Sequence, residues 1–154
     1  MRRIIIMFFV LLSPSIFWGK NVGAGIELGN ISGISLKYEN DDMIKNNNSI
    51  NSLISWRTEG DSKLSIFGDW TFNKTYIKES KDDILNLPYY YGIGSGLIFD
   101  DGVEIAVRLP LGLKYIFQEE NIEVFFEITP ALKLLKGSEA ELYIGAGARY
   151  LFKI

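Results

Sequence analysis

Apolar and polar side chains alternate along most of this chain, from Val22 to Ile154. Because successive side chains of a β-strand point to opposite faces, this period of two predicts strands with one apolar and one polar face. Turn-forming residues separate the alternating runs. The runs cover residues 22–30, 32–40, 50–57, 63–74, 89–99, 103–117, 122–134 and 139–153.

The eight runs predict an all-β, eight-stranded, antiparallel up-and-down barrel, and further features of its two faces favour a transmembrane barrel. Eight is the smallest usual strand number for a closed membrane barrel, and about 9–11 residues suffice for one tilted crossing. Leu53 and Ile54 spoil the alternation of the run at 50–57, and Phe67 is an exception in the run at 63–74. Pro110 and Pro130 lie inside runs, and because proline has no backbone N–H, we expect interrupted pairing at both.

Two connections are longer than the others. Residues 41–49 contain a run of asparagines, and residues 75–88 contain a run of charges. Such polar stretches are typical of solvated loops. We expect loops at both places and no helix after residue 20.

The chain has no Cys and no His, which limits its chemistry. Disulfides, thiolate metal sites and His-assisted nucleophiles are excluded, and the commonest general base is missing. A formal net charge of −3 disfavours nucleic acid as a partner. We therefore expect a protein that is not an enzyme and has no catalytic residues, no cofactor and no metal site.

The first 19 residues have the order of an export signal. Arg2 and Arg3 precede an apolar run at 4–12, and Ser13-Pro14-Ser15 then interrupts any helix. The apolar run is shorter than the stretch of about 20 residues that a membrane-spanning helix requires. We expect a helical signal peptide at 1–19, cleaved on export, and a barrel domain at 20–154. An uncleaved N-terminal anchor is the alternative.

Alternation leaves open which face points outwards, because soluble lipocalin-like barrels and membrane barrels share the pattern with opposite orientation. Glycine favours the membrane version. Long charged side chains fit a narrow eight-stranded interior only where neighbouring positions are empty. Gly68 lies on the apolar face, whereas the polar face holds Gly23, Gly25, Gly29, Gly33, Gly92, Gly94, Gly96, Gly112, Gly145 and Gly147.

The polar face carries both signs of charge in similar number, which predicts a network of ion pairs in the lumen. A soluble surface of mixed charge would have the same composition. The residues assigned to this lumen charge network are Arg57, Asp69, Glu104, Arg108, Lys114, Glu123, Glu127, Glu141 and Arg149, with Lys37, Lys133 and Glu27 as further partners.

Aromatic side chains gather near strand ends on the apolar face. Membrane barrels place such girdles at both interfaces, although the strand propensity of aromatic residues is an alternative explanation. The expected girdle comprises Tyr38, Trp56, Trp70, Phe72, Tyr91, Tyr115, Phe117, Tyr150 and Phe152.

The last run resembles the C-terminal assembly signal of outer-membrane barrels. In residues 147–152, a glycine is followed by aromatic residues at alternate positions, although Lys153 and Ile154 follow the Phe that usually ends such chains. With residues 90–94, 107–117 and 126–132, this segment resembles a family of small uncharacterised bacterial outer-membrane barrels of OmpA-like eight-stranded architecture.

The resemblance implies a fold, a location and two partners. The chain would be an integral protein of the bacterial outer membrane, surrounded by outer-membrane lipid. The barrel-assembly machinery would recognise its C-terminal strand through Gly147, Tyr150 and Phe152. The resemblance implies no catalytic residues.

The sequence therefore predicts a non-enzymatic outer-membrane barrel with a structural role in the envelope, a mostly plugged polar lumen and at most a narrow pore. One alternative is a secreted soluble barrel that binds an apolar ligand with its Leu, Ile and Phe side chains. Another is a barrel enzyme acting on lipid, which would depend on carboxylates such as Glu123 and Glu127. In an eight-stranded barrel, both longer connections would fall on the side of the two termini. Either the strand count is off by one or the barrel presents little outside, so a surface adhesin with long external loops is not favoured.

Overall fold

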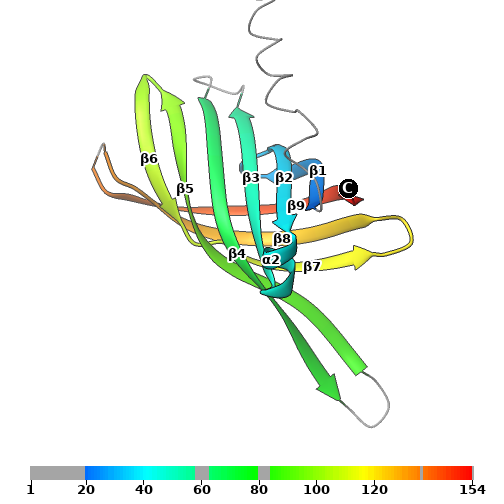
Figure 1. Ribbon diagram of the computed structural model, residues 1–154. Helices are drawn as coiled ribbons and strands as arrows, with labels where there is room; N and C mark the ends of the chain where they lie inside the picture. Colours follow the sequence, from blue (N-terminus) through cyan, green and yellow to red (C-terminus); the bar gives the residue numbers. More distant parts are fainter. Residues whose placement is uncertain (1–19, 58–62, 80–83, 136, 154) are drawn as a thin grey trace, which may run out of the picture.

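The computed structural model describes residues 20–57, 63–79, 84–135 and 137–153. The predicted signal peptide lies outside these ranges. No helix of the described ranges has both the length and the apolar character to cross a membrane. The elements in Figure 1 are β1 (Lys20–Gly29), β2 (Gly33–Asn40), α2 (Asp41–Lys45), β3 (Asn48–Arg57), β4 (Lys63–Glu79), β5 (Ile84–Asp100), β6 (Gly102–Arg108), β7 (Leu111–Phe117), β8 (Ile122–Lys133) and β9 (Glu139–Lys153).

The strands form one antiparallel sheet that closes into a ring, so the predicted all-β fold is confirmed (Figure 1). The ring closes between β1 and β9, where Val22 lies opposite Phe152 and Ala24 lies opposite Tyr150. We call the end of the ring with α2 the α2 end, and the end with the β1–β2 and β5–β6 connections the turn end.

The run predicted as one strand at 103–117 is two strands, which gives nine in the described ranges. β6 and β7 both lie between β5 and β8, and the interruption falls at Leu109 and Pro110. Pro110 cannot donate a ladder hydrogen bond, but its carbonyl accepts one from the Gly92 N–H at 2.9 Å. Pro130 lies inside an unbroken β8, but pairing is interrupted beside it as expected, because β8 pairs with β6 at Ala131 and with β7 at Ile128, which leaves Thr129 and Pro130 outside both registers.

The predictions for the two longer connections are also wrong. Residues 41–49 contain α2, which begins because the Asn40 side chain accepts a hydrogen bond from the Met43 N–H at 2.7 Å. Residues 75–88 continue β4 and β5 as a paired hairpin, from Thr75 opposite Pro88 to Glu79 opposite Ile84. The strand-forming residues Thr, Tyr and Ile at 75–77 favour this extension despite the charges that follow.

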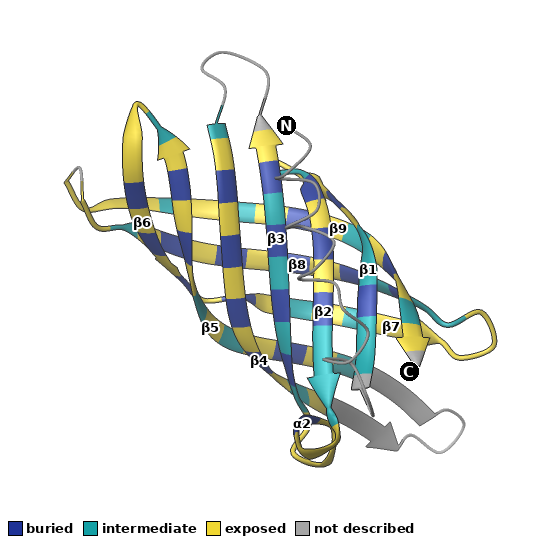
Figure 2. Ribbon diagram, turned by 45° about the horizontal axis from the view of Figure 1, so that its top comes forward, coloured by how far each residue is buried: buried dark blue, intermediate teal, exposed yellow. Residues whose placement is uncertain are grey.

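Burial alternates along the strands (Figure 2). Most buried residues, which face the inside of the ring, are polar, and the large apolar residues are mostly exposed outside. Among the described residues, 33 large apolar side chains are exposed, whereas 15 polar or charged residues are buried. The alternation keeps its phase across the β6–β7 interruption, because Val107, Leu109 and Leu111 are all exposed. Leu53 and Phe67, which both depart from the sequence pattern, point inwards and are buried.

Candidate functional site

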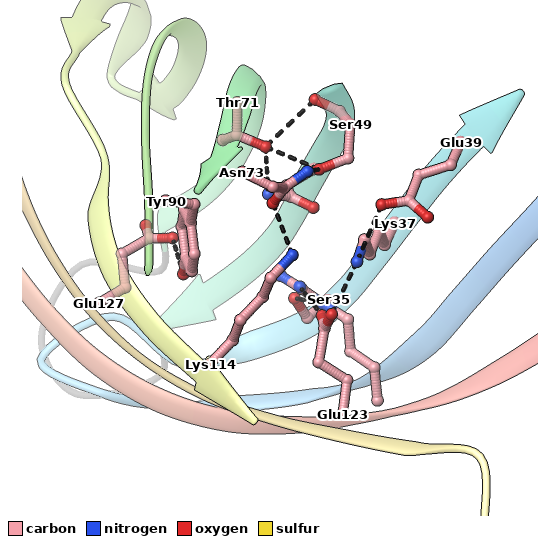
Figure 3. A network of polar contacts seen from close by, with 12 residues as sticks. Ser35, Lys37, Glu39, Ser49, Thr71, Asn73, Tyr90, Lys114, Glu123 and Glu127 are labelled. Atoms are coloured by element: carbon pink, nitrogen blue, oxygen red, sulfur yellow. Dashed lines mark hydrogen bonds and ion pairs between the residues drawn. The ribbon is translucent and has the colours of Figure 1, made fainter. Parts of the chain in front are cut away.

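The interior of the ring is the candidate site, because it gathers the ionisable side chains of strands that are far apart in sequence. Near the α2 end, the Glu123 carboxylate of β8 binds two cations. Lys37 Nζ lies 2.6 Å from Oε2 (Figure 3). Arg149 Nη1 lies 2.9 Å from Oε1. Lys37 also lies 3.1 Å from Glu39, and Arg149 Nε donates to the Ser35 hydroxyl at 2.9 Å.

A second group surrounds Arg108 of β6. Its Nε lies 3.0 Å from Asp69 Oδ1, and its Nη2 donates to Glu127 Oε1 at 3.0 Å. Glu127 also accepts hydrogen bonds from the Tyr90 hydroxyl at 2.7 Å and from the Thr129 hydroxyl at 2.6 Å. All five residues are buried, so the guanidinium and both carboxylates are held away from solvent.

A third group lies at the turn end and is more open. Lys133 Nζ lies 2.5 Å from Glu141 and 3.9 Å from Glu104, and the Tyr143 hydroxyl donates to Glu141. Lys63 lies 2.7 Å from Asp100 nearby. A recess of about 280 Å³ opens among these side chains and those of Asn30, Ile31, Ser55, Ser65, Ile98 and Leu142.

Hydroxyl and amide groups complete the interior near the α2 end. Lys114 Nζ donates to Asn73 Oδ1 at 2.6 Å (Figure 3). The hydroxyls of Ser49 and Thr71 share a hydrogen bond of 2.8 Å, and the Asn51 amide donates to Thr71 at 3.1 Å. Polar contacts therefore continue from β3 to β4 without a charged pair.

The interior glycines provide the space that these side chains occupy. A Cβ atom on Gly94 would overlap the Asp69 carboxylate, and one on Gly112 would overlap the Tyr90 ring. A Cβ on Gly145 would lie 2.5 Å from Glu27 Oε1, and one on Gly147 would lie 2.5 Å from the Phe125 ring. On the outer face, a Cβ on Gly68 would have no neighbour within 4 Å.

The structure brings together most residues of the predicted lumen charge network, but in three separate groups. Among the described residues, no carboxylate forms an ion pair with Lys114, and the Arg57 side chain lies outside the described part of the chain. Sequence reasoning missed Tyr90, Asn73 and Tyr143. Tyr90 alternates with Gly92 and Gly94, so its inward position could have been read from the pattern.

The predicted girdle residues lie on the outer face, where Tyr38 is half-buried and the other eight are exposed. Their distribution is uneven, because register and strand bounds place only Trp56 of this set near the turn end. Near the α2 end, ring centroids are 5.6 Å apart for Phe72 and Tyr91, and 4.9 Å apart for Tyr150 and Phe152. Within the predicted assembly signal, Tyr150 and Phe152 project outwards from β9, whereas Gly147 packs against Phe125.

The chemistry of the interior is that of paired charges. Glu123 and Glu127 bind different cations, so they do not form a shared acid–base pair. In the part of the chain that the structure describes, no group of three or more His, Cys, Asp or Glu residues is arranged to hold a metal ion. The interior is suited to filling and bracing the ring.

Comparison of the chain with family models, curated proteins and solved structures finds no match.

Proposed function

We propose that the protein is a non-enzymatic integral barrel of the bacterial outer membrane, with a structural role in the envelope and a closed lumen. The observation that carries the proposal is the inverted placement of side chains, with the aliphatic and aromatic set outside and the ions inside. Monomeric soluble proteins rarely expose apolar patches larger than a few hundred Å². An outer surface of this kind fits a membrane barrel, whose apolar band faces acyl chains.

Strand count and length agree with this proposal. β6 and β7 both pair with β5 and β8, and taking them as one crossing that is interrupted at Pro110 gives the eight crossings of the proposed barrel. In the outer membrane, the surrounding partner would be lipid, and Tyr150 and Phe152 at the end of β9 would serve the assembly machinery. A preceding export signal at 1–19 belongs to the same proposal.

The test is to express the full chain in a Gram-negative host and to separate soluble from membrane fractions. We expect the protein to need detergent for extraction and to migrate differently on a gel before and after boiling. Recovery of a monodisperse protein from the soluble fraction without detergent would contradict the proposal. Turnover of labelled lipid by the refolded protein would contradict its non-enzymatic part.

The soluble alternative needs the Leu, Ile and Phe set to line a ligand cavity. Leu111, Leu113 and Phe126 are instead exposed on the outer wall, at 51%, 45% and 45% of their surface. No observation favours this second function, and we do not propose it.

A further inference from the structure

An apolar layer crosses the lumen between the Arg108 group and the turn-end recess. It consists of Leu53 of β3, Phe67 of β4, Ile98 of β5 and Ala106 of β6, each at most 5% exposed. Leu53 and Phe67 lie opposite each other on neighbouring strands. Phe67 and Ala106 lie in register through Gly96 of β5, and Ile98 lies one inward pair towards the turn end, opposite Ser65. The layer thus covers four neighbouring strands of the wall.

Polar residues border this layer on both sides along the β3–β4 ladder. The next inward-facing pair towards the α2 end is Asn51 opposite Asp69. The next inward-facing pair towards the turn end is Ser55 opposite Ser65. All four residues are buried. The layer therefore separates two polar regions of the lumen.

Phe67 carries the layer across the lumen. Its ring centroid lies 5.8 Å from that of Tyr143 on β9, a strand that does not pair with β4. Ile31 also packs against the layer. Phe67 thus brings the apolar layer into contact with the opposite wall of the ring.

The neighbouring wall is shaped to receive the Phe67 ring. Gly96 of β5 lies opposite Phe67, and a Cβ atom there would overlap the ring. Ala106 lies opposite Gly96 on the next strand and is fully buried. These two small residues on neighbouring strands leave the volume that the Phe67 side chain fills.

Arg108 holds the ring from the α2 side. Its guanidinium carbon lies 4.6 Å from the Phe67 ring centroid and 6.0 Å from that of Tyr143, within the range of a cation–π contact. Asp69 and Glu127 fix the guanidinium, as described above. The ion pairs thus position the aromatic layer.

We propose that Phe67 is the seal of the lumen, and that the ion pairs support it rather than form the barrier themselves. The proposal rests on the membrane barrel proposed above. Charged and hydroxyl side chains offer water a continuous set of hydrogen-bonding partners, whereas an apolar constriction closes a pore by losing its water. Solutes from the turn end would enter the recess beside Ser65 and stop at Phe67.

The first experiment records conductance in planar bilayers for wild type, Phe67→Ala and Phe125→Ala. Phe125 is the matched control, because its ring is 4% exposed and lies 4.0 Å from the Arg149 guanidinium carbon, outside the layer. We expect closed wild-type and Phe125→Ala barrels, and a conductance in Phe67→Ala at least about tenfold higher. A Phe67→Leu variant, which keeps the layer apolar, should stay closed.

Heat-modifiable gel mobility is measured first for each preparation. If wild type fails this assay, the proposed membrane barrel fails rather than the seal. The seal is contradicted if inserted wild type conducts steadily, if folded Phe67→Ala stays closed, or if Phe125→Ala opens equally.

A second experiment does not depend on the folding of Phe67→Ala. Because the chain has no cysteine, Ser65→Cys and Asn51→Cys give single thiols on the two sides of the layer. An impermeant thiol reagent is added to either side of vesicles that contain the refolded barrel. We expect Ser65→Cys to react from one side and Asn51→Cys not to react from that side. Reaction of both thiols from the same side, or no reaction of Ser65→Cys, would contradict the seal.

Discussion

Two carboxylates of the lumen make similar ion pairs in different surroundings. The Glu123 side chain is 1% exposed and binds both Lys37 and Arg149, whereas the Glu141 side chain is 30% exposed and binds Lys133. If the pair at the turn end is broken, water can solvate Glu141. If Glu123 is removed, the Lys37 and Arg149 side chains, which are 4% and 3% exposed, stay buried without its charge. Breaking an ion pair of the same kind therefore costs much more stability in the enclosed region than at the turn end.

The largest effect is expected for Glu123→Gln, which leaves two buried cations without their shared counter-charge. Breaking a buried ion pair by removing one partner costs about 3–5 kcal/mol, so the free energy of unfolding should fall by that amount. Urea unfolding of the barrel refolded in detergent, followed by tryptophan fluorescence, measures the loss. A loss below that of the turn-end variant Glu141→Gln would contradict the contrast between the two regions.

The outer wall extends the comparison, since a charge placed there has no counter-charge at all. Ile128 lies in the middle of β8 and is exposed, so we expect Ile128→Arg to destabilise a membrane-inserted barrel by about 2–4 kcal/mol. Equilibrium refolding into lipid vesicles measures this cost, with the exposed turn variant Glu119→Arg as the control. If Ile128→Arg is neutral in vesicles, the outer wall does not face acyl chains.

Glycine substitutions sharpen the comparison between the inner and outer faces of the ring. Inside, Gly94→Ala would place a Cβ atom against the Asp69 carboxylate and 2.6 Å from the Gly68 carbonyl oxygen, and such overpacking costs about 1–3 kcal/mol. Outside, Gly68→Ala meets nothing within 4 Å and should be neutral or slightly stabilising. Urea midpoints of the two variants measure the difference, and equal midpoints would show that the interior has spare room.

The smallest effect is expected for Glu141→Gln at the turn end. A partly solvated pair contributes about 0–1 kcal/mol, because water replaces the lost partner and salt screens the attraction. Urea unfolding at low and high salt checks this value. A loss as large as that of Glu123→Gln would mean that the turn end is as enclosed as the centre.

Strand positions and the identity of the inner face could be predicted from the sequence, because alternation is a local property of each strand. The glycines on the polar face, such as Gly94 and Gly112, were a second local signal. The helix α2 was missed because a five-residue helix depends on one cap, Asn40, within a stretch rich in asparagine. Pro110 interrupts a strand and Pro130 does not, although both lack the same N–H.

The grouping of charges could not be predicted, because it depends on the stagger between strands that are distant in sequence. The charge pattern of β6 alone does not reveal that Arg108 meets Asp69 of β4 and Glu127 of β8. Phe67 illustrates the same limit, since it looked like an error in the pattern of one strand. Its position becomes meaningful only beside Gly96 and Ala106 on the next two strands.

Quenching of tryptophan fluorescence by lipids with brominated acyl chains tests most directly whether the apolar wall meets the membrane. In a Trp18→Phe variant, the remaining tryptophans are Trp56 and Trp70, which are 53% and 43% exposed on the outer wall. We expect strong quenching of both after refolding into such vesicles, with blue-shifted emission. Unquenched emission at the wavelength of tryptophan in water would show that this wall faces solvent.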